Sequence, residues 1–207
     1  MKTLKIGIAS YEDMKARTLA IARGQLRPKG HEPKVWFTST ESFAKVLSHV
    51  GGESMSTGID ARLAALGIEL PPVSKPVANY LGCKQVGDLL YVGGHGPVTA
   101  GGITRGKVGG TVSVEEARAA AKATALSMLA TVRAELGTLD RVLQIIKVFG
   151  MVNCAPGFNR TPEVIDGCSD VLVAIFGDAG RRTRSAVGMA ELPFDICVEI
   201  EMVLQVV

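Results

Sequence analysis

The stretch FDICVEIEMVLQV, residues 194–206, decides the fold of this chain. Its apolar side chains recur at every second position from Phe194 to Val206, and the positions between them hold Cys197, Glu199, Glu201 and Gln205. A period of two is typical of a β-strand with one buried and one polar face. The stretch therefore predicts a strand that packs one face on a core and turns its carboxylates away from that core.

Outward from this strand, capping and turn residues divide the preceding sequence into further elements. A capping box formed by Ser113 and Glu116 starts a long alanine-rich helix, and Thr161 followed by Pro162 starts the next one. The sequence predicts helices at residues 59–66, 113–136 and 161–176, and strands at residues 79–85, 89–93, 103–108, 141–152 and 182–189.

The order of these elements predicts their arrangement in space. Each long helix follows one strand and precedes another, so right-handed crossovers place both helices on the same face of one sheet. We therefore expect an α+β fold with a single mixed sheet and two long helices on one face. The other face stays open, and a partly apolar open face favours association with copies of the same chain.

Composition narrows the class of protein. The chain has 207 residues, of which 47% are hydrophobic and 21% are charged, as in an ordinary globular protein. Apolar residues are too frequent for general disorder, and no apolar run approaches the ~20 residues that a membrane helix needs. We expect a cytoplasmic protein without a membrane partner.

Charge divides the chain into two parts. Residues 1–54 carry nine basic and five acidic side chains, whereas residues 55–207 carry 14 basic and 15 acidic ones. Gly51-Gly52 resembles a linker, and the pattern before it indicates strand, helix, strand and helix. We therefore predict a small N-terminal α/β extension in residues 1–54 and the main domain in residues 55–207.

The last two predicted strands suggest a functional site. Residues 190–193 are expected to join them as an antiparallel hairpin, which places Arg184 opposite Glu199. Arg184, Glu199 and Glu201 would then share the face away from the helices. Two interpretations remain open: a cross-strand salt bridge on a solvated face, or an anion clamp beside a general base.

Other segments offer weaker signals. Residues 93–97, GGHGP, lack the pattern of a nucleotide-binding P-loop, although their backbone N–H groups could line a small pocket. The basic cluster at residues 181–184 is short and lacks interleaved aromatic residues, which makes a nucleic-acid partner unlikely. Only one of the three histidines lies beyond residue 54, so no histidine-based metal site is expected in the main domain.

Three segments match one known pattern without a gap: residues 183–188 (TRSAVG), 192–193 (LP) and 198–201 (VEIE). Tyr80 and residues 93–97 support the same match. On these residues the main domain resembles the Rid family, which comprises YjgF-like proteins and RidA enamine/imine deaminases. Residues 153–169 differ from the deaminase pattern and resemble the divergent branch labelled "putative endoribonuclease" or chorismate-mutase-like.

The resemblance implies a chorismate-mutase-like fold and a homotrimer with sites at the subunit interfaces. It implies hydrolysis of reactive 2-imino or 2-enamino acids to 2-oxo acids and ammonia, with no metal or organic cofactor. The implied roles are substrate-carboxylate binding for Arg184, positioning of the attacking water for Glu199, a pocket position for Tyr80, a water-binding backbone carbonyl at Ala186, and substrate contact by Gly94 and His95.

Two alternatives to the deaminase stay open. The same Arg184 clamp would serve a non-catalytic module that binds a small carboxylate or oxo acid, and the basic residues would serve a protein that acts on RNA. The presence of Glu199 favours catalysis over capture, and the charge of the main domain disfavours RNA. Residues 32–39 resemble the start of small bacterial DNA-binding regulators, but the helix-turn-helix that should follow is absent.

Overall fold

The computed structural model describes residues 58–73, 78–99 and 102–207 of the chain. The predictions for residues 1–54, including the α/β extension and its boundary with the main domain, lie outside the described residues.

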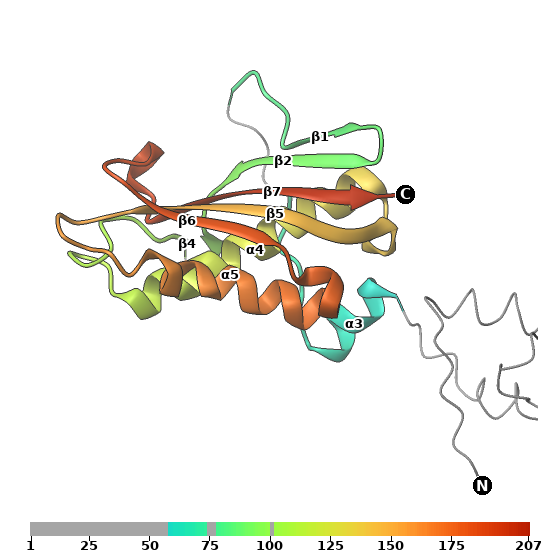
Figure 1. Cartoon of the computed structure of the whole chain (residues 1–207), viewed down its shortest axis with the longest axis horizontal. Helices are drawn as coiled ribbons and strands as arrows, with labels where there is room; N and C mark the ends of the chain where they lie inside the picture. The colour runs from blue at the N-terminus through green and yellow to red at the C-terminus, as the bar shows by residue number, and fades with distance from the viewer. Residues whose placement is uncertain (1–57, 74–77, 100–101) are drawn as a thin grey trace, which may run out of the picture. The chain divides into compact units, whose positions relative to one another are not determined.

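A five-stranded sheet with two long helices on one face forms the main domain (Figure 1). The strand order is β1-β2-β7-β5-β6, and all neighbours are antiparallel except β5 and β6, which are parallel. The predicted mixed sheet with both long helices on one face is confirmed. The elements are β1 (Cys83–Val86), β2 (Leu89–His95), α4 (Val114–Leu136), β5 (Val142–Asn153), α5 (Thr161–Phe176), β6 (Thr183–Met189) and β7 (Val198–Val206).

Shorter elements complete the main domain. A short helix, α3 (Ile59–Ala65), precedes the sheet, and β3 (Val98–Thr99) pairs with β4 (Gly102–Ile103). The predicted strand at 103–108 is mostly wrong, because only isolated bridges continue beyond β4. Three 3₁₀ turns are η1 (Leu139–Arg141), η2 (Gly177–Gly180) and η3 (Pro193–Asp195).

The helix starts follow the capping signals in the sequence. The Ser113 hydroxyl accepts the backbone N–H of Glu116, and the Glu116 carboxylate accepts the backbone N–H of Ser113. This capping box confirms the predicted start of α4, and Gly137 ends the helix with a φ of 82°, a conformation that suits glycine. Thr161 is the first helical residue of α5 rather than its N-cap, and its hydroxyl donates to the Ala186 carbonyl oxygen at 3.1 Å.

The predicted hairpin between the last two strands is wrong. β5 lies between β6 and β7, and β6 pairs with β5 in parallel. The physical reason is the α5 crossover, which returns the chain to the sheet beside β5 and in the same direction. The link 190–197 then crosses the end of β5 to reach β7. The last strand begins at Val198 instead of residue 194, because Phe194 and Asp195 adopt left-handed φ angles of 57° and 58°.

Glycines allow α5 to pack closely on its neighbours. A Cβ at Gly150 of β5 would lie 2.6 Å from the Ile165 side chain, and a Cβ at Gly167 would overlap the backbone carbonyl of Arg118 on α4. Gly167 is therefore a packing residue between the two helices. The core lies between the sheet and this helix pair, as the buried side chains Val198, Ile200, Met202 and Leu204 of β7 show.

The sheet face away from the helices carries a second, smaller apolar cluster. Its buried members are Met151, Leu192 and Ile196, with Phe149, Val187 and Met189 packed against them. It forms because the link 190–197 folds back over the ends of β5 and β6. Cys197, expected on the polar face, is fully buried and belongs to the main core instead.

Candidate functional site

Glu199 stands on the open face of the sheet, in the middle of the strand order. Its register partner on β5 is Met151, and β2 lies on its other side. The side chain is partly buried, and no hydrogen-bond or ion-pair partner for it exists among the described residues. Burial raises the pKa of the Glu199 carboxyl group, and the negative charge of Glu201 raises it further. A carboxylate of this kind is suited to general-base chemistry.

A break in the β2 register gives Glu199 its space. The pairing of β2 with β7 shifts between Val92 and His95, and Gly94 lies within the shift. A Cβ at Gly94 would overlap the Glu199 carboxylate, so glycine is required for this side-chain position. The structure therefore brings together two of the predicted site residues, Glu199 and Gly94.

The His95 side chain points to the opposite side of the sheet. Its ring is buried, with Nδ1 donating to the Gly93 carbonyl at 2.8 Å and Nε2 2.8 Å from the Thr131 hydroxyl on α4. Burial lowers the pKa of His95, which keeps the ring neutral. Nδ1 is bonded within β2 and Nε2 ties β2 to α4, so both ring nitrogens are engaged, and substrate contact at His95 stays a prediction.

Tyr80 belongs to the same part of the domain as Gly94. It lies just before β1 with 52% of its surface exposed, two residues ahead of Gly82, whose carbonyl accepts the backbone N–H of Gly93 at 3.0 Å. Its ring is free to line a surface site. No hydrogen bond joins Tyr80 to Glu199 among the described residues.

Arg184 lies on the helix side of the edge strand β6. Its register partner is Val148, and its Nη1 donates to Asp166 Oδ1 at 2.7 Å and to Ser169 Oγ at 2.9 Å, both on α5. Two residues further along β6, the Ala186 carbonyl oxygen accepts the Thr161 hydroxyl. Arg184 and Ala186 thus form a second group at the edge of the sheet.

The two groups are separated within one copy of the chain. Glu199 and Glu201 share the open face, as expected, but Arg184 does not, because its register partner Val148 belongs to the core on the helix side and its side chain meets α5. In addition, β5 lies between β6 and β7. The prediction that Arg184 and Glu199 stand opposite each other is wrong for a single copy. The simple cross-strand salt bridge is excluded for the same reason, since Arg184 pairs with Asp166 instead.

Sequence reasoning identified the basic neighbour Arg182 but not Asp166 and Ser169, the hydrogen-bond partners of Arg184. Arg182, two positions earlier, has buried Nε and Nη2 atoms without a hydrogen-bond partner in the described chain, and burial lowers its pKa. Asp166 and Ser169 are spaced three apart on one helix, which places them on the same helical face. The spacing of Asp166 and Ser169 indicates a shared helix face, but the sequence does not show that this face of α5 packs against β6.

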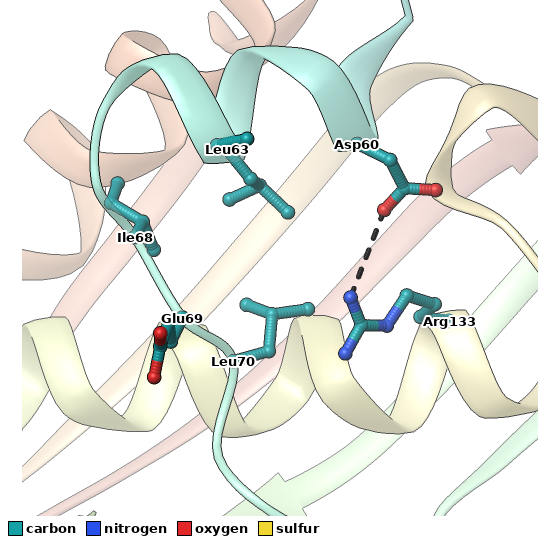
Figure 2. Close-up of a pocket in the computed structure, with 7 residues that line it drawn as sticks. Asp60, Leu63, Ile68, Glu69, Leu70 and Arg133 are labelled. Atoms are coloured by element: carbon teal, nitrogen blue, oxygen red, sulfur yellow. Dashed lines mark ion pairs between the residues drawn. The ribbon is translucent and has the colours of Figure 1, made fainter.

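The recess in Figure 2 lies away from both groups. It is formed by α3, the extended segment after it and α4, and its lining residues include Asp60, Leu63, Ile68, Leu70 and Arg133. Arg133 Nη1 lies 3.9 Å from Asp60 Oδ1. Because none of the predicted site residues lines this recess, we place the candidate site at Glu199 and Arg184.

The described residues hold neither a metal-ligand cluster nor a membrane-spanning helix. No three histidine, cysteine, aspartate or glutamate side chains within residues 58–73, 78–99 and 102–207 gather closely enough to hold a metal ion. None of the helices in this part of the chain combines the length and apolar character needed to cross a membrane.

The fold and these residues define the class of protein. Residues 60–203 match the family model described as "YjgF/chorismate mutase-like, putative endoribonuclease". This match covers more than half of the chain, and the chain therefore belongs to the YjgF/chorismate mutase-like family.

Individual relatives span the same region. The Trypanosoma cruzi protein named TCP17 is 38% identical over 149 residues, which are 71% of this chain and 93% of that protein. The crystal structure of Atu1372 from Agrobacterium tumefaciens, described as of unknown function, is 39% identical with a TM-score of 0.66, covering 74% of this chain and 96% of that one. A structure described as a "putative endoribonuclease" from Shewanella oneidensis is 30% identical with a TM-score of 0.69, covering 72% and 100%.

Proposed function

We propose that the chain hydrolyses reactive 2-imino and 2-enamino acids to 2-oxo acids and ammonia. The observation that carries this proposal is Glu199, a partly buried carboxylate with a raised pKa and no partner among the described residues, next to a glycine that keeps its surroundings open. A carboxylate in such a setting can take a proton from water. The resemblance to the Rid family, stated from residues 183–201, supports the choice of substrate.

The reaction needs only water as co-reactant. An enamine first tautomerises to the imine, as one proton is added at carbon and one is lost from nitrogen. Glu199 removes a proton from a water molecule while the water oxygen bonds to the imine carbon, and the C=N electron pair moves to nitrogen, which is protonated. The resulting carbinolamine loses ammonia as its hydroxyl group gives up a proton and becomes the carbonyl of the 2-oxo acid.

The site that we propose is shared between copies of the chain. Glu199, Gly94 and Tyr80 would come from one copy, and Arg184 with the Ala186 carbonyl from its neighbour. The apolar cluster on the open face and the exposed side chains Tyr91 and Ile146 support burial of this face in an assembly. We expect a homotrimer, with a mass in light scattering about three times the 21.8 kDa of the chain. A monomer at micromolar concentration would contradict the shared site.

Ammonia release tests the function directly. With 2-aminoacrylate generated in situ, the wild-type chain should accelerate formation of ammonia and pyruvate over the spontaneous rate. Arg184→Ala should lose both binding and turnover, because the substrate carboxylate is left without its charged partner. Absence of acceleration by the wild type, combined with pyruvate binding, would favour the non-catalytic binding module.

The names of the family and of the Shewanella protein point to RNA cleavage as the other function to test. The basic cluster at residues 181–184 gives it little support, because Arg182 is packed against the domain and Arg184 is paired with Asp166. Incubation of the same protein with a single-stranded RNA therefore serves as the second arm of the experiment. Cleavage that is lost in Glu199→Gln, without ammonia release, would overturn our proposal.

A further inference from the structure

The Arg184 guanidinium group is held at one end only. Nη1 donates to Asp166 Oδ1 at 2.7 Å and to Ser169 Oγ at 2.9 Å. The Arg184 side chain is 25% exposed and the Asp166 side chain 39%, so this ion pair is partly buried. A planar group held through two hydrogen bonds at Nη1 has its plane fixed by the helix beneath it.

The opposite edge of the same guanidinium is open. Nε and Nη2 of Arg184 have no hydrogen-bond partner among the described residues, and neither atom is among the fully buried ones. These two N–H groups point in parallel and match the two oxygens of a carboxylate. Asp166 therefore does not block the arginine, since it occupies Nη1 and leaves the bidentate edge free.

The local charge also remains favourable for an anion. Asp166 offsets the charge of Arg184, and Asp170 is engaged by Arg118 at 2.6 Å. Arg182 lies close enough to Arg184 and Cys168 to influence them electrostatically, and it has no ion-pair partner in the described chain. The cluster thus keeps an excess of one positive charge, which suits a ligand with a single carboxylate.

We propose that Asp166, assisted by Ser169, is a positioning residue that aims the Nε/Nη2 edge of Arg184 at the substrate carboxylate. This inference rests on the proposed function, because it assigns Arg184 the role of carboxylate binder. It adds that the affinity for 2-imino and 2-oxo acids depends on a side chain that never touches them. Loss of Asp166 frees the guanidinium to rotate, so binding weakens while the chemistry at Glu199 continues.

Variants of the full chain test the inference with two probes, pyruvate in calorimetric titration and 2-aminoacrylate in turnover. Asp166→Ala should raise the pyruvate Kd and the KM about tenfold, the effect of losing a hydrogen bond to a charged group, and should change kcat less than about threefold. Asp166→Asn should restore most of the affinity, because its amide oxygen still accepts the Nη1 hydrogen. Glu163→Ala, which removes the ion pair of Glu163 with Arg160 from the same helix, is the matched control and should behave as wild type.

A double-variant comparison separates positioning from general damage. In an Arg184→Ala background, Asp166→Ala should not lower the residual rate of ammonia release any further, because both changes remove the same interaction. Additive losses, or an Asp166→Ala variant with unchanged KM, would overturn the inference and leave the proposed function standing. If Asp166→Ala fails to fold, Ser169→Ala, which removes the other acceptor of Nη1, gives the same comparison with a smaller expected loss. A wild-type chain that neither binds pyruvate nor releases ammonia would instead overturn the proposed function, and the inference with it.

Discussion

The two halves of the proposed site are fixed by different kinds of structure. Glu199 stands on β7, with β2 and β5 on either side, and is placed by the backbone register and by the space at Gly94. Arg184 stands on the edge strand and is placed by side-chain hydrogen bonds from Asp166 and Ser169. The position of Glu199 therefore depends on the backbone of the sheet. The position of Arg184 depends on two side chains that can each be substituted separately.

The largest effect on the rate is expected from a variant that removes the base of the glutamate half and leaves the rest of the site unchanged. Glu199→Gln keeps the size of the side chain but cannot accept a proton, and loss of a general base typically lowers a rate by about 10²–10⁴-fold. We expect imine hydrolysis at least ~100-fold slower than wild type, measured as ammonia release, with pyruvate binding retained. Equal rates for the two proteins would show that Glu199 is not the base.

A second change tests whether the backbone places Glu199. In Gly94→Ala the new methyl group overlaps the carboxylate, and the flexible end of the glutamate must move aside. The fold should survive, because only a side-chain end is displaced, but misplacement by about an ångström can reduce the rate by about 100-fold. The rate of ammonia release checks the expected loss of activity in Gly94→Ala, and thermal unfolding checks that the fold is retained. In a Glu199→Gln background, Gly94→Ala should add little, and a large additional loss there would contradict the proposed contact.

A third change weakens the anchor of the glutamate half. Thr131→Val keeps the shape of the side chain but removes the hydroxyl that meets His95 Nε2 at 2.8 Å. A buried ring nitrogen without its partner should lower the free energy of unfolding by about 1–3 kcal/mol in urea titration. The control, Thr183→Val, removes a hydroxyl whose bond to the Ile146 carbonyl is exposed, and should have a smaller effect. Similar losses for both would show that His95 is not a significant anchor.

Local patterns in the sequence were sufficient to predict most of the fold. The alternation in residues 198–206, the Ser113 capping box and the glycine at 137 are short-range signals, and each produces the expected element. Strand neighbours are a long-range property. The expected β6–β7 hairpin is wrong because sequence proximity favours pairing of adjacent strands, whereas the α5 crossover places β6 on the far side of β5.

The same distinction explains the outcome for the site. Glu199, Gly94 and Arg184 were selected from a family pattern, and Glu199 and Gly94 indeed lie in contact distance of each other. The partners of Arg184 were not selected, because Asp166 and Ser169 meet it only through the packing of α5 on β6. His95 resembled a pocket residue in sequence, but only the β2 register shows that its ring faces α4.

The smallest expected effect concerns the pH dependence of the glutamate half. Glu199 must be ionised to act as a base, so the rate should fall as the pH drops through its pKa, and burial places that pKa above the ordinary value for glutamate. Glu201 adds to this rise through its negative charge. Glu201→Gln removes the charge and should move the acid limb of the kcat/KM profile to lower pH, but not to the ordinary value, because burial, the larger cause, remains. The matched control is Glu69→Gln, on the segment after α3, which should not change the pH dependence of kcat/KM. A shift of the acid limb toward higher pH in Glu201→Gln would show that Glu199 is not the titrating base.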